Sequence, residues 1–123
     1  MSVPEMTGVG TLLGEVEVRY GKSGKPWGTA RMAAQEWKKG AAGKWESVDH
    51  YYDLIMFGTM AENCASSLTR GMRVVVWGRL HHERWEKDGV KRSGYKLFVD
   101  DIAPALSRAS ATVERNADAP EWA

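Results

Sequence analysis

Hydrophobic and polar residues alternate along most of this chain with a period of two, the pattern of β-strands that bury one face. Short runs rich in Gly, Pro, Ser, Asp and Lys separate the alternating segments, as turns do between strands. In the first segment Leu12, Val16 and Val18 share one parity, and charged residues take the other. We expect five strands, at residues 11–20, 30–37, 48–57, 72–85 and 90–102.

A change to helical spacing interrupts the alternation after residue 58. Thr59 and Glu62 stand three residues apart, which is the spacing of a capping box. Small and apolar residues follow at helical intervals up to Leu68, and Arg70 and Gly71 suit the end of a helix. We expect one short helix here, between the third and fourth strands.

Turn signals and length define the domain organisation. Asp88-Gly89, between the last two strands, is the sequence of a tight hairpin turn. Pro104 ends the alternation, and the chain that follows is rich in Ala and Ser. Because 123 residues suffice for one buried core, we expect a single domain over residues 1–106 and a flexible C-terminal tail over residues 107–123.

Five strands with one short helix between the third and the fourth follow the element order of the OB-fold, a small Greek-key barrel. The sequence therefore predicts an all-β, five-stranded OB-fold barrel. Barrels of this kind often bind oligonucleotides on one face and its loops.

Several aromatic residues lie in the predicted strands on the parity opposite to the core. Trp37, for example, shares its face with Arg31 and Gln35. An exposed ring can stack on any unpaired base, so such rings suit single strands and read little sequence. We predict base stacking by four residues: Trp37, Tyr51, Phe57 and Trp85. Packing inside the barrel or between subunits is the alternative role for these rings, and Trp77 fits either role.

Charge is distributed unevenly along the chain. The formal net charge is only +1, but residues 19–96 contain 15 Lys and Arg against 8 Asp and Glu. A basic central segment can attract a polyanion while acidic ends keep the whole chain near neutrality. We predict phosphate contacts by seven residues: Arg31, Lys38, Lys39, Lys44, Arg73, Arg79 and Arg84. For each of them singly, a solvated surface is the alternative.

Motifs for catalysis are weak. His81 and His82 are consecutive on a predicted strand, so they point to opposite faces and do not converge on one metal ion. Gly24-Lys25 and Gly43-Lys44 lack the spacing and the following Ser or Thr of a phosphate-binding Walker A loop. Cys64 fits a small core residue better than a nucleophile. We expect no enzyme activity, no cofactor and no metal.

The sequence also carries signals about location. No segment is apolar over the length of a membrane span, and residues 1–10 lack the features of a signal peptide. A single cysteine fits a reducing compartment. We expect a cytoplasmic, nucleoid-associated protein without membrane contact.

Several spaced motifs resemble those of the bacterial single-stranded DNA-binding protein family, SSB, over roughly residues 8–106. The most specific are Ala61-Glu62-Asn63, Leu68, Arg70-Gly71, Val74-Val75-Val76, Gly78-Arg79-Leu80, Trp85 and Gly89-Val90-Lys91-Arg92. Two earlier pieces also fit, namely Glu17-Val18-Arg19-Tyr20 and Leu54-Ile55-Met56-Phe57-Gly58.

This resemblance implies an OB-fold that assembles as a homotetramer and wraps single-stranded DNA in replication, recombination and repair, without catalysis. It also implies base stacking by Trp37, Tyr51, Phe57 and Trp85. Tyr51 stands where a Trp is common in the family, so the ring is kept and the stacking area is smaller.

Two features depart from the family pattern. Gly14 leads almost directly into Glu17, where the family usually has a longer bend, so the strand that helps to pair subunits is shorter. Family members typically end in an acidic segment closing with Pro-Phe, which docks other genome-maintenance proteins. This chain keeps only Asp118, Pro120, Glu121 and Trp122 of such a segment, so partner docking through them ranks behind a tail that does not dock.

Two functions of other classes compete with single-stranded DNA binding. An oligomeric OB-fold adaptor would use the exposed rings for protein contacts and would bind little nucleic acid. A metal-dependent nuclease ranks third, because the sequence offers no convincing cluster of metal ligands.

Overall fold

The computed structural model describes residues 3–117. Its elements, in chain order, are β1 (Glu5–Leu12), β2 (Glu17–Tyr20), β3 (Pro26–Lys39), β4 (Trp45–Phe57), α1 (Thr59–Ser67), β5 (Arg73–Lys87) and β6 (Val90–Pro104). The all-β class and the short helix between the predicted third and fourth strands are confirmed.

Five of the strands close into a barrel. The sheet order is β1-β5-β6-β4-β3-β2, and an additional pairing of β1 with β3 completes the ring. β1 lies along β5 and passes to β3 at Thr11 and Leu12. Gly10 precedes this change of partner, and an added Cβ would lie 2.6 Å from Cγ of Met32 and 2.7 Å from the carbonyl oxygen of Ala33. A residue without a side chain is therefore needed where the barrel closes.

The prediction of one strand over residues 11–20 is wrong. β1 begins earlier, at Glu5, and residues 13–16 leave the strand before β2 begins at Glu17. Leu12 pairs with Met32 and Glu17 with Thr29, so four residues on this side face two on β3. The chain bulges here because it must turn around the closing barrel while β1 and β2 both stay paired with β3.

The predicted capping box is also wrong, although the helix forms. Gly58 is the N-cap, with a φ of 69° and no side-chain cap hydrogen bond. The helix ends at Ser67, and Leu68 is already extended. Gly71, with a φ of +86°, turns the chain into β5 instead of ending the helix, and the N–H of Arg70 donates to Glu15 at 3.2 Å.

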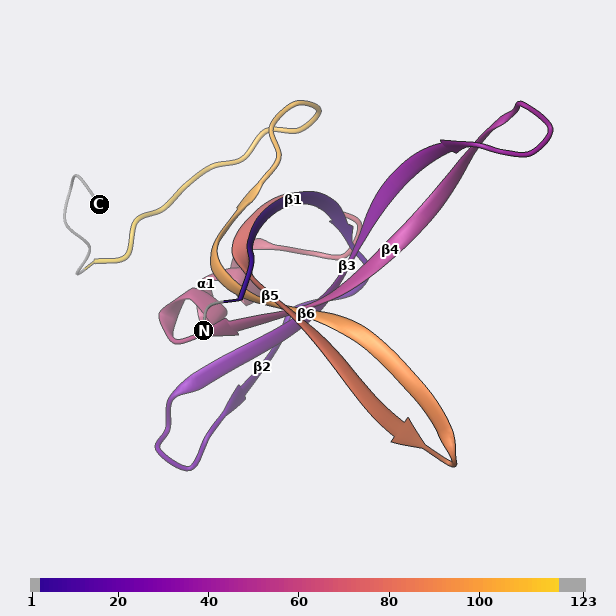
Figure 1. The fold of residues 1–123 in the computed structure, drawn as a ribbon. Helices are drawn as coiled ribbons and strands as arrows, with labels where there is room; N and C mark the ends of the chain where they lie inside the picture. The colour runs from indigo at the N-terminus through magenta and orange to yellow at the C-terminus, as the bar shows by residue number, and fades with distance from the viewer. Residues whose placement is uncertain (1–2, 118–123) are drawn as a thin grey trace.

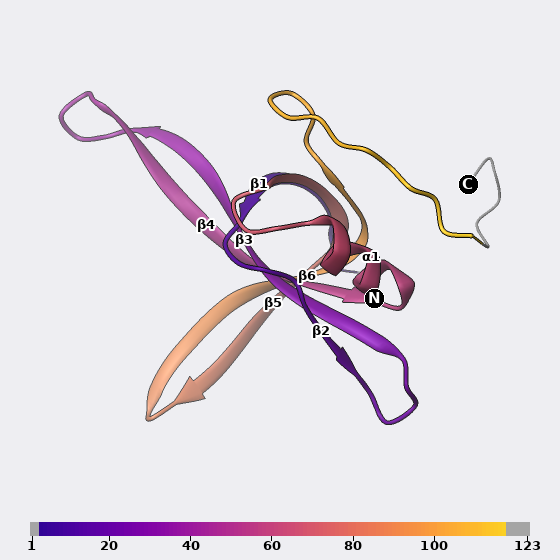
Figure 2. The same ribbon diagram turned by 180° about the vertical axis from the view of Figure 1, so that it is seen from behind.

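Three hairpins extend from the barrel (Figure 1). The hairpins of β3 with β4 and of β5 with β6, hereafter the first and second arm, diverge on the side away from α1, and the same divergence is visible from behind (Figure 2). The hairpin of β2 with β3 lies nearer the helix and is joined to it where the Tyr20 hydroxyl donates to Glu62 at 3.2 Å. Asp88 and Gly89 have φ of 53° and 76°, which confirms the tight turn of the second arm.

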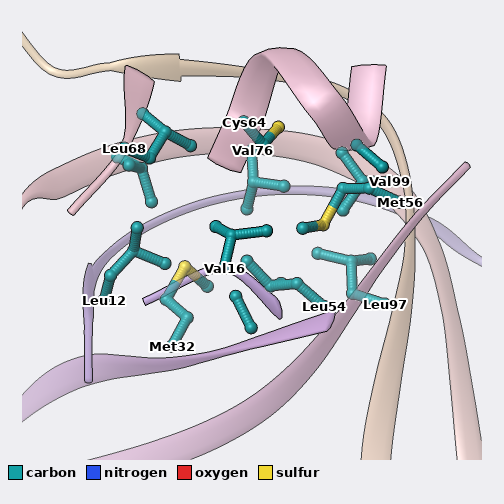
Figure 3. Packing of buried hydrophobic residues seen from close by; sticks show 13 residues of the cluster. Leu12, Val16, Met32, Leu54, Met56, Cys64, Leu68, Val76, Leu97 and Val99 are labelled. Carbon is teal, nitrogen blue, oxygen red and sulfur yellow. The ribbon is translucent and has the colours of Figure 1, made fainter. Parts of the chain in front are cut away.

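The core is a cluster of apolar side chains from every strand of the barrel and from α1 (Figure 3). Met32 and Leu54 are fully buried, and Cys64 and Leu68 cover them from the helix side of the barrel. The other end of the barrel lies between the two arms. There Tyr52, Tyr95 and His82 pack ring against ring, with centroids 5.8 Å and 4.9 Å apart.

A β-bulge in β6 keeps both parts of that strand on the core. Trp77 pairs with Asp101 but Gly78 pairs with Val99, so Asp100 is the extra residue. The bulge changes the parity that faces inward, and Val99 and Ile102 therefore both pack on the core. Strict alternation over the predicted fifth strand does not hold here.

Beyond β6 the chain leaves the barrel. Residues 107–117 contain no helix or strand in the part that the structure describes. The docking residues predicted from the sequence, Asp118, Pro120, Glu121 and Trp122, lie outside the described residues. Among residues 3–117, no helix has both the length and the apolar character to cross a membrane.

The close approach of β5 and β6 at the bulge generates a stability prediction. A Cβ at Gly78 would overlap the carbonyl oxygen of Phe98, a backbone atom that cannot move aside alone. We expect Gly78→Ala to lower the free energy of unfolding by about 1–3 kcal/mol, the usual cost of overpacking. Urea unfolding followed by circular dichroism measures the change.

Gly14→Ala is the matched control, because a Cβ there would have no neighbour within 4 Å. Equal stability of the two variants would contradict this account of the bulge.

Candidate nucleic-acid interface

The strand register places the four predicted stacking rings on one side of the sheet. Residues paired across antiparallel strands share a face, and faces alternate along each strand. Tyr51 pairs with Ala33 of β3, which is four residues from Trp37 and therefore on the same face. Phe57 pairs with Trp27, which also shares that face of β3. Ile55, on the same face, pairs with Phe98 of β6, and Trp85 lies further along that face on β5. We call this side, which points away from the core, the outer face.

All four rings are accessible on the outer face. Their exposed fractions are 61% for Trp37, 47% for Tyr51, 55% for Phe57 and 47% for Trp85. The alternation that placed them away from the core is therefore confirmed, and packing inside the barrel is excluded for them.

The outer face has the shape of a V. Its floor is the stretch where β4 and β6 pair in parallel, from Tyr52 opposite Tyr95 to Ile55 opposite Phe98. Beyond that stretch the two arms diverge (Figure 1). Trp37 lies out on the first arm and Trp85 on the second, while Phe57 lies on β4 two residues beyond the floor, on the side away from the arms. Along β3 the face runs ten residues, from Trp27 to Trp37, or about 33 Å.

Cations stand between these rings, each held by a carboxylate. The Arg31 guanidinium lies over the Tyr51 ring, 4.8 Å from its centroid, and its Nε is 4.0 Å from Oδ1 of Asp53. On β5, Nε of Arg79 is 3.7 Å from Oδ1 of Asp100. The pairs are solvent-exposed, so each contributes little to stability and leaves the cation available to a competing anion.

The other predicted phosphate contacts are more scattered. Lys39 shares the parity of Trp37 at the end of the first arm, and Lys44 lies in the turn of that arm. Lys38 and Arg84 fall on the opposite parity, behind the rings. Arg73 is on the outer parity but pairs with Thr11 of β1, six residues along β5 from Arg79. The structure brings Arg31, Arg79 and Lys39 to the ring side and places the other four elsewhere.

Sequence reasoning missed several residues of the outer face. Trp45, 66% exposed, shares the side of Trp37, because β4 begins at residue 45 and not at 48 as predicted. Phe98 stacks on Phe57, with ring centroids 6.1 Å apart and planes 15° apart. Lys96 bonds to Glu83 at 3.0 Å on the same face. The signal for Trp45 was present in the sequence, because the alternation of the predicted third strand extends three residues further toward the N-terminus.

Two open depressions mark the outer face and the second arm. A groove of about 710 Å³ lies over the floor, between the loop of residues 13–15 and Trp27, and includes Arg31, Ile55 and Lys96. A second, of about 550 Å³, surrounds Trp85 with Arg92 and Lys91. Both contain a Trp ring and cations, as single-strand binders do, and carboxylates line them as well: Glu15, Glu17 and Asp53 in the first and Glu86 in the second.

The opposite side of the first arm holds an ion pair. Nε2 of His50 is 2.6 Å from Oε2 of Glu36, and this hydrogen bond, with Lys38 nearby, lowers the pKa of the Glu36 carboxyl. Glu36 therefore stays ionised below the pH at which a free glutamate is protonated. Because both side chains are exposed, we assign them to arm stability and not to a site.

Geometry argues against the catalytic alternatives. His81 contacts Phe98 edge-on at 4.6 Å on the outer face, while His82 contacts Tyr95 on the other, as expected for consecutive strand residues. Within residues 3–117, no three His, Cys, Asp or Glu side chains gather as metal ligands. Burial raises the pKa of the Cys64 thiol to about 11, so the nucleophilic thiolate is scarce at neutral pH.

Comparison with known proteins identifies the family of the chain. A sequence model described as the single-strand binding protein family matches residues 3–105. A single-stranded DNA-binding protein of Aquifex aeolicus is 32% identical over 94 residues, which cover 76% of this chain and 64% of that protein. Single-stranded DNA-binding protein 2 of Streptomyces coelicolor is 37% identical over 120 residues, covering 89% of this chain and 57% of that protein. The chain thus spans less than two thirds of either relative.

Solved structures show the same fold. The crystal structure of a small single-stranded DNA-binding protein from Streptomyces coelicolor superposes with a TM-score of 0.77, covering 89% of this chain and all of that one. Its sequence identity is 23%, so this likeness concerns the fold alone. The prediction of an OB-fold barrel of this family type is confirmed.

Proposed function

The chain belongs to the single-strand binding protein family, and we propose that it binds single-stranded DNA without catalysis and with little sequence preference. The family is defined by binding, which agrees with the expectation that the chain is not an enzyme. The observation that carries the proposal is the set of accessible rings on one face, Trp37, Tyr51, Phe57 and Trp85, with cations between them.

In the proposed mechanism the rings hold bases that have left the stack, and the cations follow the sugar-phosphate backbone. Stacking needs only the flat face that every base has, so the surface does not read sequence. Arg31 serves both parts, because its guanidinium covers the Tyr51 ring and can exchange Asp53 for a phosphate. We assign this activity to replication, recombination or repair, where single strands are exposed.

The arms extend the binding path beyond one barrel, and we propose that the protein forms a homotetramer, as the family resemblance implies. A second exposed surface supports this. On the outer side of β1 and β5, Val9 is 42% exposed and Trp77 40% exposed, and both lie beside Val75. Among the described residues β1 pairs with β3 only at Thr11 and Leu12, so its second edge is otherwise open to another strand.

The first prediction of the proposal concerns the rings. Wild-type protein should quench its Trp emission on addition of oligo-dT and should bind duplex of equal length less tightly. Trp37→Ala and Trp85→Ala should each weaken the affinity for oligo-dT by about 5- to 150-fold, equivalent to about 1–3 kcal/mol per base. Anisotropy of a labelled oligo-dT at low salt measures the change.

Tyr20→Leu is the control for these variants, because Tyr20 is also an exposed ring, 64% accessible, but lies on the β2–β3 hairpin, off the outer face. Unchanged affinity of the Trp37→Ala, Trp85→Ala double variant would reject the stacking mechanism. If that variant instead lost a protein partner, the adaptor function would replace DNA binding.

A second prediction concerns the first arm's cations. Removing two lysines that each neutralise a phosphate should reduce the slope of log affinity against log salt by about 1.4, or about 0.7 for each. The test variant combines Lys39→Ala with Lys44→Ala. The same anisotropy assay measures its affinity from 50 to 300 mM salt, which is a range of roughly sixfold in ionic strength. Lys22→Ala with Lys25→Ala, in the β2–β3 turn, removes the same charge elsewhere. Equal slopes for the two pairs would show a general field effect and no local contact.

A third prediction concerns assembly. Light scattering should give four times the chain mass of 13.7 kDa, and Trp77→Glu should lower that mass because it places a charge in an apolar contact. Thr7→Glu, which changes the residue paired with Trp77, tests the same surface independently. A monomeric wild-type protein would exclude the tetramer.

A further inference from the structure

Phe98 of β6 pairs with Ile55 of β4 at the end of the floor that lies farther from the two arms. We propose that Phe98 is a fifth base-stacking residue, which forms with Phe57 a two-ring platform for neighbouring bases of the single strand. The inference rests on the proposed function and deepens it, because it assigns a further part of the binding site.

The geometry of the two rings suits a platform. Their planes are only 15° apart, so both present faces of nearly the same orientation. Their centroids are 6.1 Å apart, so the rings overlap only in part and each keeps a free portion. Phe57 is 55% exposed and Phe98 is partly exposed. A strand with unstacked bases is longer than the roughly 3.4 Å per nucleotide of a duplex strand, and successive bases can therefore occupy both rings.

The orientation of Phe98 is fixed by its neighbours. His81 meets the ring edge-on, with centroids 4.6 Å apart and planes 67° apart. Ile55 is its partner on β4 and Arg79 its partner on β5. The rings of His81 and Phe57 thus both contact Phe98, which limits its side-chain freedom before a base stacks on it.

Cations flank the platform at the positions a backbone would need. Arg79 pairs directly with Phe98, and Lys96 lies two residues away on the same face of β6. Each cation now bonds to a carboxylate, Arg79 to Asp100 and Lys96 to Glu83, and a phosphate can replace either partner. The Phe98 ring with these two cations is the same combination of ring and cation that we propose for the rings on the arms.

Substitution tests whether the ring itself binds. Phe98→Leu keeps an apolar side chain and removes the ring, and Phe57→Leu does the same at the other ring of the proposed platform. We expect Phe98→Leu to weaken the affinity for oligo-dT by about fivefold or more, the lower bound for one stacked base. Tyr20→Leu is again the control, because Tyr20 is an exposed ring that lies off the outer face, on the β2–β3 hairpin. Thermal unfolding of each variant confirms that it is folded.

Photo-crosslinking of the wild-type protein gives a readout that does not depend on variants. A 5-bromodeoxyuridine oligonucleotide should crosslink to the tryptic peptide of residues 97–108, in which Phe98 is the one aromatic residue. Wild-type affinity in Phe98→Leu, or a crosslink map that contains Phe57 but not this peptide, would overturn the platform and leave the proposed function intact. If wild-type protein did not bind oligo-dT at all, the proposed function would fail, and the platform with it.

Discussion

The unbroken antiparallel register between β3 and β4 is the constraint on which the rest of this structure depends. It runs without a shift from Trp27 opposite Phe57 to Lys39 opposite Trp45. A slip of one residue would exchange the two faces along the whole length and would turn the rings inward. Met32 and Leu54, buried at the barrel, prevent that slip, because either would otherwise move into water. The core therefore fixes the side on which Trp37 stands, although Trp37 lies beyond the core.

Each central cation of the outer face is paired with a carboxylate, and this pairing limits what the proposed binding of a polyanion gains at each contact. Arg31, Arg79 and Lys96 are held in place on the outer face by Asp53, Asp100 and Glu83. Binding then exchanges one anion for another, so the gain per contact is smaller than for a free cation. The exposed pairs cost little to open, and they orient the cations before the strand arrives. Under the proposed function, affinity therefore depends on the rings as well as on charge.

The alternation of apolar and polar residues was sufficient to predict the exposed face of a strand wherever the apolar residues are the buried ones. The parity of β3, β4 and β5 placed Trp37, Tyr51 and Trp85 on the accessible side before any coordinates. It failed where the closing of the barrel overrides the local pattern. Residues 13–16 bulge because the chain must turn around the closing barrel. Asp100 is an extra residue because β6 stays paired with β5 on both sides of it. The contact of Phe57 with Phe98 joins residues 41 positions apart in the sequence, and no local pattern indicates which residues meet across a parallel pairing.

The arms carry most of the candidate interface, and physical reasoning indicates why they are suited to it. A two-stranded hairpin without a core beneath it is only marginally stable in water. The outer half of the first arm has exposed residues on both faces, and its side-chain contacts are exposed pairs such as His50 with Glu36. The barrel, by contrast, is closed at one end by α1 and at the other by the Tyr52, Tyr95 and His82 rings. Stability is therefore concentrated in the barrel and low in the arms, as is common for elements that bind ligands. An arm of this kind can adjust to the path of a flexible strand, while the register inherited from the core keeps its rings on the correct side.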